Sequence, residues 1–143
     1  MTTVLAVDLG SASGRVLAGT LTDGRLDVTD IHRFKHEARR REDGTLTWDV
    51  ATMEAETIIG LKKALEQFPD AKTVSIDTWG VDWAPLDDNG ELVGDVIAYR
   101  DERTSRTLDA FRDRIADREF FDLTGNQPAT INTANQLFAY LQE

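Results

Sequence analysis

Eight consecutive residues near the start of the chain combine a carboxylate, two hydroxyls and an arginine with small turn residues: Asp8-Leu9-Gly10-Ser11-Ala12-Ser13-Gly14-Arg15. Successive N–H groups of a tight turn can form a positively polarised concavity that binds an anion. The hydroxyls of Ser11 and Ser13 would add donors, and the two glycines would permit close approach. Arg15 adds positive charge, and Asp8 carries the carboxylate oxygens that Mg²⁺ prefers. An ordinary hairpin with small turn residues explains the same pattern equally well.

The elements on either side of this segment decide which kind of phosphate loop it can be. Residues 4–7 are an apolar run typical of a buried strand, and residues 15–21 continue in an extended, β-branched pattern. A P-loop requires a lysine and a following helix, and the dinucleotide-binding fingerprint also opens a helix. We therefore expect strand–turn–strand. A second turn at Asp23-Gly24 leads to a third strand over residues 26–36, which completes an antiparallel meander.

The rest of the chain predicts alternating helices and strands. Asp49 is a good N-cap, and the helix that follows it should end at Pro69. Its inward face is expected to be Ile58, Leu61, Leu65 and Phe68. Strands are predicted over residues 45–48 and 73–76, a hairpin turn over 87–90, and helices from Thr104 and over 120–123, the latter closed by Gly125. The segment Thr133-Ala134-Asn135-Gln136 has the pattern of a capping box that starts a last helix.

A second group of polar and aromatic residues follows the predicted strand over residues 73–76, in Asp77-Thr78-Trp79-Gly80-Val81-Asp82. The indole of Trp79 could stack on a sugar face or belong to the core. Asp77 and Asp82 could form a carboxylate pair for hydrolysis, although capping or turn duty at a strand end is the simpler role. His32 and His36 have no cysteine nearby and no clear carboxylate partner, which argues against a zinc pair.

Composition limits the partners of the chain. Its 143 residues carry 26 acidic and 16 basic side chains, for a formal charge of −10, and no cysteine. This charge repels nucleic acids and anionic membranes, so neither is expected as a partner. It also repels ATP, which would need Mg²⁺, backbone N–H groups and local cations in order to bind. The first residues lack the pattern of a signal peptide, so a cytoplasmic location is expected.

Taken in order, the motifs resemble a known family. Val7-Asp8-Leu9-Gly10-Ser11-Ala12-Ser13-Gly14-Arg15 resembles the first phosphate motif of the FGGY carbohydrate kinases, within the actin and hexokinase superfamily. Ile76-Asp77-Thr78-Trp79-Gly80-Val81-Asp82 resembles the sugar-side motif of one branch, the L-rhamnulokinases. Tyr99-Arg100-Asp101-Glu102-Arg103-Thr104, Ile31-His32-Arg33-Phe34 and Thr47-Trp48-Asp49 are similar to further blocks of the same branch. One departure is Ala129-Thr130-Ile131-Asn132-Thr133, where the family usually has Pro-Phe-Asn-Thr.

The resemblance implies an α/β fold of the ribonuclease-H-like, actin/hexokinase type with a mixed sheet. Residues 1–143 would form the N-terminal part of a two-domain kinase that phosphorylates a ketose, with L-rhamnulose favoured, and uses ATP and Mg²⁺. By carry-over, the ATP phosphates would contact Ser11, Ala12, Ser13, Gly14 and Arg15. Asp8 would hold the metal. Gly80 would touch the sugar through its backbone, with Trp79 and Tyr99 as pocket walls.

No catalytic residue is expected within the chain, because in this family the aspartate base and the adenosine site lie beyond the position of Glu143. The chain alone is therefore expected to be inactive. It is also expected to self-associate, because half of a two-domain clamp exposes apolar surface. Two other functions remain open: another FGGY kinase that acts on fuculose or xylulose, and a non-catalytic actin-like module for nucleotide-dependent assembly.

Overall fold

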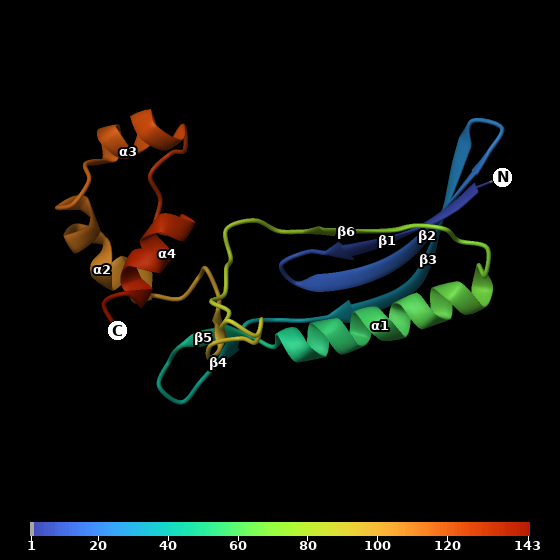
Figure 1. Cartoon of the computed structure of the whole chain (residues 1–143), viewed down its shortest axis with the longest axis horizontal. Helices are drawn as coiled ribbons and strands as arrows, with labels where there is room; N and C mark the ends of the chain where they lie inside the picture. The colour runs from blue at the N-terminus through green and yellow to red at the C-terminus, as the bar shows by residue number, and fades with distance from the viewer. Residues whose placement is uncertain (1) are drawn as a thin grey trace. The chain divides into compact units, whose positions relative to one another are not determined.

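The computed structural model describes residues 2–143, which form two compact units (Figure 1). Unit 1 contains the chain up to Ala38 together with Asp49–Gly80, and unit 2 contains Arg39–Trp48 and Val81–Glu143. Among residues 2–143, no helix combines the length and the apolar character that crossing a membrane requires.

Unit 1 is built on a four-stranded mixed sheet in the order β3-β2-β1-β6. Its strands are β1 (Thr2–Leu9), β2 (Ser13–Thr22), β3 (Arg25–Lys35) and β6 (Val74–Thr78). The first three form the predicted antiparallel meander, and β6 lies parallel to β1. Asp23 and Gly24, which join β2 to β3, both have positive φ, 51° and 82°, as tight hairpin turns require. The mixed sheet confirms the predicted α/β class.

Helix α1 (Val50–Gln67) packs against this sheet. Its N-cap is the predicted one, because the Asp49 carboxylate accepts a hydrogen bond of 2.9 Å from the amide of Thr52. The core of the unit is formed by Leu5, Val7, Val16, Ala18 and Ala64.

The predicted inward face of α1 is wrong at two of its four positions. Leu61 and Phe68 pack against the core, but Ile58 is 43% exposed and Leu65 is 49% exposed. Helix α1 approaches the sheet closely at Gly60, where an added Cβ would lie 2.9 Å from the Cβ of Val16. Because the helix approaches the sheet along this glycine, the buried stripe is rotated away from the large side chains that its apolar spacing suggested.

Unit 2 combines a small sheet with three helices. The sheet has the order β4-β5-β7 and contains β4 (Arg39–Arg40), β5 (Leu46–Trp48) and β7 (Val96–Ile97). The helices are α2 (Arg103–Arg112), α3 (Asp117–Thr124) and α4 (Thr133–Tyr140). The ring of Phe111 on α2 packs edge-on against Phe120 of α3 and Phe138 of α4, with centroids 6.0 and 5.5 Å apart. These aromatic contacts hold the three helices together.

Two turns of unit 2 follow the sequence prediction closely. The Asp87 carboxylate accepts the amides of Asn89 and Glu91 at 2.8 and 2.9 Å, and Gly90 has a φ of 83°. The pKa of Asp87 is lowered, chiefly by the hydrogen bond that its carboxylate accepts from the amide of Glu91. Helix α3 ends at Gly125, whose φ of 69° is the left-handed conformation expected of a C-terminal glycine.

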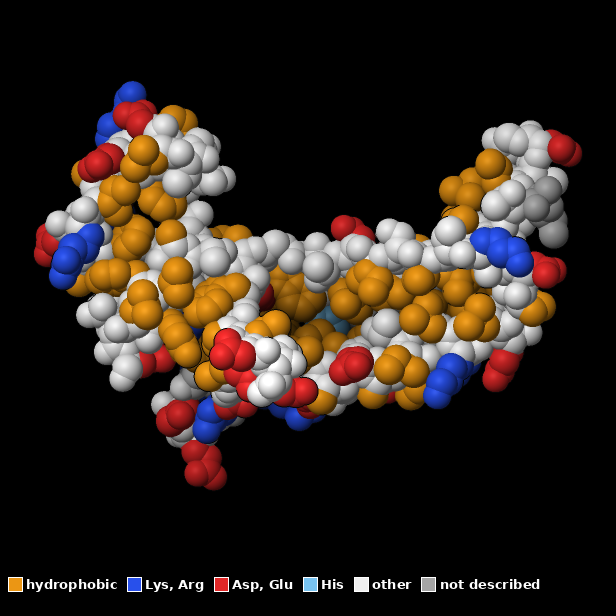
Figure 2. All heavy atoms as spheres, in the orientation of Figure 1, with side chains coloured by type: hydrophobic (Ala, Val, Ile, Leu, Met, Phe, Trp, Pro, Cys, Tyr) orange, Lys and Arg blue, Asp and Glu red, His pale blue; other side chains and the backbone are white. Residues whose placement is uncertain are grey.

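Apolar side chains remain exposed on unit 1. They include Val74 and Ile76 on the edge strand β6 and Ile58 and Ile59 on α1. Figure 2 shows hydrophobic side chains gathered over the part of this unit where α1 and the strands lie. The self-association expected from the sequence stays a prediction, and this surface is where we would expect it.

Candidate functional site

The segment singled out for phosphate binding is the turn between β1 and β2. The two strands pair antiparallel along their length, and the amide of Gly10 donates to the carbonyl of Ser13 at 3.0 Å, which closes the turn. Ser11 and Ala12 form its exposed tip. The predicted strand–turn–strand arrangement is therefore confirmed.

The tip of this turn presents donors that the rest of the described chain does not use. Among residues 2–143, the amides of Ser11 and Ala12 have no acceptor, and the hydroxyls of Ser11 and Ser13 have no partner. Exposed N–H and hydroxyl donors on a tight turn suit an anion such as phosphate. The turn therefore fits a phosphate group, and the roles of these three residues as ATP contacts stay predictions.

Arg15 and Asp8 are registered neighbours on β2 and β1, and their side chains form an ion pair. The two side chains are 38% and 34% exposed. Asp77 on β6 is the registered neighbour of Asp8 on its other side, so one basic and two acidic residues follow one another across three strands. The Asp8 carboxylate has the chemistry of a Mg²⁺ ligand. Because it already holds the Arg15 guanidinium, a metal ion there would have to share or displace that partner.

Gly14 has a packing role in addition to its predicted role in phosphate binding. It is buried, and a Cβ at this position would lie 2.6 Å from Cε1 of the Phe34 ring and overlap its tip. The missing side chain therefore leaves room for a ring on β3, whatever Gly14 contributes to phosphate binding. Its expected contact with ATP stays a prediction.

His36 lies beside the turn and is only 8% exposed. Its amide donates to the carbonyl of Ala12 at 3.3 Å, and its ring stacks on Trp79 with centroids 5.6 Å apart. Burial lowers the pKa of His36 and outweighs a hydrogen bond with the backbone of Gly10, which raises it. Trp79, predicted as a sugar-pocket wall, thus packs on the histidine whose amide bonds the β1–β2 turn.

His32, unlike His36, does have a carboxylate partner, contrary to the sequence analysis. Its Nε2 lies 2.6 Å from Oε2 of Glu56 on α1. Its Nδ1 lies 3.1 Å from Nζ of Lys63. His32 therefore links β3 to the helix. Within residues 2–143, no group of three or more histidine, cysteine, aspartate or glutamate side chains is placed to hold a metal ion.

The other two predicted sugar contacts belong to different units. Gly80 ends unit 1, is exposed, and would meet no atom within 4 Å if it carried a Cβ, so its backbone is open to a ligand. Tyr99 belongs to unit 2 and is half-buried. Its amide donates to Oδ1 of Asp82 at 2.7 Å, and its hydroxyl accepts from Nε of Arg100 at 2.8 Å. Their roles in sugar binding stay predictions.

Two aspartates with the chemistry of catalytic groups instead hold segments of unit 2 together. Asp82 accepts the indole N–H of Trp48 at 2.7 Å on Oδ2, and its Oδ1 takes the amide described above. Asp101 is buried and accepts the amides of Leu46 and Arg103, both at 2.8 Å. Each carboxylate thus holds two chain segments together. The carboxylate-pair hydrolase considered from the sequence is not favoured, because one of its two aspartates is bound in this way.

One contact between distant segments of unit 2 gives no signal in the sequence. The spacing of Thr133 and Gln136 predicts a local capping box, but the N-cap of α4 is Asn132 and neither side chain has a capping role. Instead, the hydroxyl of Thr133 and Nε2 of Gln136 both donate to the carbonyl of Val81, at 2.8 and 3.0 Å. The capping pattern S/T-x-x-Q gives no signal of a partner more than fifty residues away.

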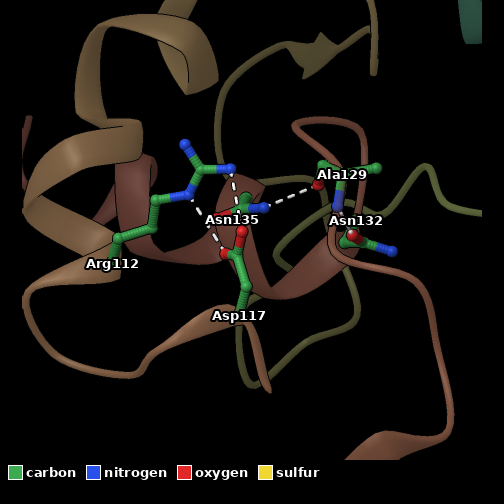
Figure 3. Close-up of polar contacts among 5 residues, drawn as sticks. All are labelled: Arg112, Asp117, Ala129, Asn132 and Asn135. Atoms are coloured by element: carbon green, nitrogen blue, oxygen red, sulfur yellow. Dashed lines mark hydrogen bonds and ion pairs between the residues drawn. The ribbon is translucent and has the colours of Figure 1, made fainter. Parts of the chain in front are cut away.

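Unit 2 also contains a hollow of about 320 Å³ that none of the predicted site residues lines. Figure 3 shows two of its features. Arg112 and Asp117 form a two-bond ion pair with both distances 3.0 Å. In addition, the amide of Ala129 donates to Oδ1 of Asn132 at 2.6 Å. The carbonyl of Ala129 accepts from Nδ2 of Asn135, also at 2.6 Å. These asparagines fix the turn that precedes α4.

Comparison with known proteins gives a consistent result. Residues 3–142 match the N-terminal domain of the FGGY family of carbohydrate kinases. The chain is 38% identical to the rhamnulokinase of Bacillus subtilis (strain 168) over 133 residues, which is 93% of this chain and 27% of that protein. It is 37% identical to the rhamnulokinase of Enterococcus faecalis (strain ATCC 700802 / V583) over 142 residues, which is 99% of this chain and 28% of that protein. The chain thus spans little more than a quarter of the length of these relatives.

Solved structures show the same fold. A gluconate kinase from Lactobacillus acidophilus superimposes with a TM-score of 0.81 at 12% identity, over 99% of this chain and 28% of that one. A xyloylose kinase from Brucella ovis gives a TM-score of 0.75 at 18% identity, over 99% of this chain and 29% of that one. At these identities the likeness concerns the fold.

Proposed function

Because the chain belongs to the FGGY family of carbohydrate kinases, we propose that the intact protein transfers the terminal phosphoryl group of ATP to a ketose, with L-rhamnulose as the favoured substrate. The observation that carries the proposal is the β1–β2 turn with its unused donors at Ser11 and Ala12, within a chain 38% identical to a rhamnulokinase. A phosphoryl group in transfer carries charge that such pre-positioned donors stabilise. Mg²⁺, when bound, would offset further negative charge on the phosphates.

Within this proposal each residue of the turn has a distinct task. The amides of Ser11 and Ala12 would hold phosphate oxygens, and the hydroxyls of Ser11 and Ser13 would add donors. Arg15, which now pairs with Asp8, would turn its guanidinium toward the phosphates, while the freed carboxylate of Asp8 would bind the metal or its water shell. The exposed backbone of Gly80 would contact the sugar, and Trp79 and Tyr99 are each expected to contact it as well.

The proton of the attacking sugar hydroxyl must also be removed. A general base has to lie within hydrogen-bond reach of that hydroxyl. Asp82 and Asp101 are unsuited to this role because each anchors two segments of unit 2. We propose that the base and the adenosine site come from a part of the intact protein outside residues 2–143. A polypeptide of residues 1–143 alone should then release no ADP in response to sugar, and detectable turnover would contradict this assignment.

The substrate can be tested on the full-length protein by measuring ADP release with L-rhamnulose, L-fuculose and D-xylulose. We expect the highest kcat/KM with L-rhamnulose. A preference for xylulose would overturn the branch assignment while leaving the kinase activity intact. Nucleotide binding without turnover on any sugar would instead favour the actin-like assembly module.

A further inference from the structure

The Gly80–Asp82 segment contains a backbone conformation that its sequence would not favour. Val81 has a φ of 74°, in the left-handed region, whereas Gly80 does not have a positive φ. A β-branched residue rarely adopts this conformation, because its Cβ crowds the following carbonyl group. The glycine beside it could adopt it freely. Such a conformation persists only where the surrounding structure imposes it.

Two side chains of α4 are placed to impose it. The Val81 carbonyl accepts from Oγ1 of Thr133 at 2.8 Å and from Nε2 of Gln136 at 3.0 Å. A carbonyl oxygen has two lone pairs, so its capacity is filled. Gln136 is 1% exposed, and Nε2 also donates to the carbonyl of Ile131 at 2.9 Å. Both hydrogens of this buried amide are therefore used, one on the turn before α4 and one on Val81.

The two segments that meet in this contact, Asp82 beside Val81 and the turn before α4, are themselves held in place by hydrogen bonds. Asp82, the next residue, is held through Trp48 and Tyr99 by two charge-assisted hydrogen bonds of 2.7 Å. The turn before α4 is held by Asn132 and Asn135, whose side chains bond the backbone of Ala129 (Figure 3). The carbonyl of Val81 thus lies between two rigid supports. Its left-handed conformation fixes the orientation of the peptide group that joins Gly80 to Val81.

We propose that Thr133 and Gln136 are positioning residues that hold Val81 in its left-handed conformation and thereby fix the Gly80 backbone for the sugar. The inference rests on the proposed function, because it assigns these residues to the sugar side of that site. Neither residue needs to touch the substrate. Their effect should fall on sugar binding and leave ATP binding unchanged, since the phosphate turn is formed by β1 and β2.

The test compares variants of the full-length protein by calorimetry with L-rhamnulose and by steady-state kinetics. Thr133→Val removes the hydroxyl at an exposed position, and Thr133→Ser keeps it. We expect Thr133→Val to raise the sugar Kd and KM roughly 2- to 10-fold, as loss of one hydrogen bond implies, with the KM for ATP unchanged and Thr133→Ser restoring sugar affinity. Gln136→Met should act in the same direction and more strongly. The matched control is Gln142→Met, because Gln142 is an exposed glutamine just after α4.

A second substitution separates positioning from general stability. In a Val81→Gly background the left-handed conformation no longer needs support, so Thr133→Val should change the sugar Kd much less than it does beside valine. An equal effect in both backgrounds would overturn the proposal, and so would equal changes in the KM for sugar and for ATP. Hydrogen exchange gives a readout without substrate: the amide of Tyr99, which donates to Asp82 beside Val81, should exchange faster in Thr133→Val than in Thr133→Ser.

The exchange measurement also distinguishes the two hypotheses. If the wild-type protein binds none of the three ketoses, the proposed function fails, and exchange of the Tyr99 amide still decides whether Thr133 holds this segment. If exchange is identical in Thr133→Val and Thr133→Ser, the positioning role fails even when the protein is an active rhamnulose kinase.

Discussion

The guanidinium of Arg15 forms an ion pair with the carboxylate of Asp8, its registered neighbour across the β1–β2 ladder. Arg15 is predicted to contact a phosphate of ATP and Asp8 to bind the metal ion, yet in the structure the two side chains pair with each other. The pair is about one-third exposed, so it contributes about 1 kcal/mol or less to folding. Its place beside the turn therefore matters more for binding than for stability.

Substituting Arg15 should separate these two contributions. In the full-length protein, Arg15→Gln should raise the KM for ATP by about 10-fold or more, because a charge-assisted hydrogen bond is worth roughly 1.5–3 kcal/mol. Its unfolding free energy should fall by no more than about 1 kcal/mol. The matched control is Arg25→Gln, which removes an arginine paired with Asp27 in the same sheet but away from the turn. An unchanged KM for ATP in Arg15→Gln would show that the guanidinium serves only its partner.

Gly14 and Gly10 flank the same turn and should respond differently to alanine. Gly14→Ala places a methyl group against the ring of Phe34. Such overpacking costs typically about 1–3 kcal/mol, so we expect the unfolding free energy of Gly14→Ala to fall by about this amount. At Gly10 the nearest atom to an added Cβ is the Ser13 carbonyl oxygen at 3.4 Å, an ordinary contact, so Gly10→Ala should fold normally. Urea unfolding of both variants measures the difference. Gly14→Ala combined with Phe34→Leu should recover part of the loss, and no recovery would mean that the ring is not the cause.

At Gly60, helix propensity and packing act in opposite directions. Alanine is favoured over glycine inside a helix by about 1 kcal/mol. Here, however, the added Cβ would lie 2.9 Å from the Cβ of Val16 and 3.1 Å from that of His32. Overpacking costs about 1–3 kcal/mol, so we expect Gly60→Ala to lower the unfolding free energy. In a Val16→Ala background the same substitution should cost less, because the contact with Cγ2 of Val16 is removed while the contacts with the two Cβ atoms remain. Stabilisation in the wild-type background would contradict the close approach of α1 to the sheet.

The sequence predicts most of what depends on neighbouring residues. The N-cap at Asp49, the turn at Asp87 and the helix end at Gly125 all appear as expected, because each is decided by a side chain and amides a few positions away. The strand–turn–strand arrangement of β1 and β2 is predicted for the same reason, since strand chemistry lies on both sides of the turn.

What the sequence does not predict are contacts between distant segments. The need for glycine at position 14 depends on the ring of Phe34, twenty positions away. The buried face of α1 depends on how closely Gly60 approaches β2. The contact of Thr133 and Gln136 with Val81 resembles a local cap when only the spacing is visible. The left-handed φ falls on Val81 and not on the adjacent glycine, which no local preference would suggest.

His36 predicts how stability should change with pH. Burial holds its pKa below the ordinary value of 6.5, so the folded protein keeps the ring neutral where the unfolded chain takes up a proton. Stability supported by the neutral ring is fully present above about pH 6.5 and is lost as the pH falls from there toward the lowered pKa of the folded state. Unfolding free energies measured in urea between pH 5 and 8 should therefore fall toward acid.

The control for His36 is the variant His36→Phe, which keeps a ring beside Trp79 and Phe34 but cannot titrate. Its unfolding free energy should decline less between pH 7 and pH 5 than that of the wild type, because one group that binds protons preferentially in the unfolded state has been removed. Equal declines in the two proteins would mean that the ring titrates alike in both states, and that the carboxylates alone account for the pH dependence.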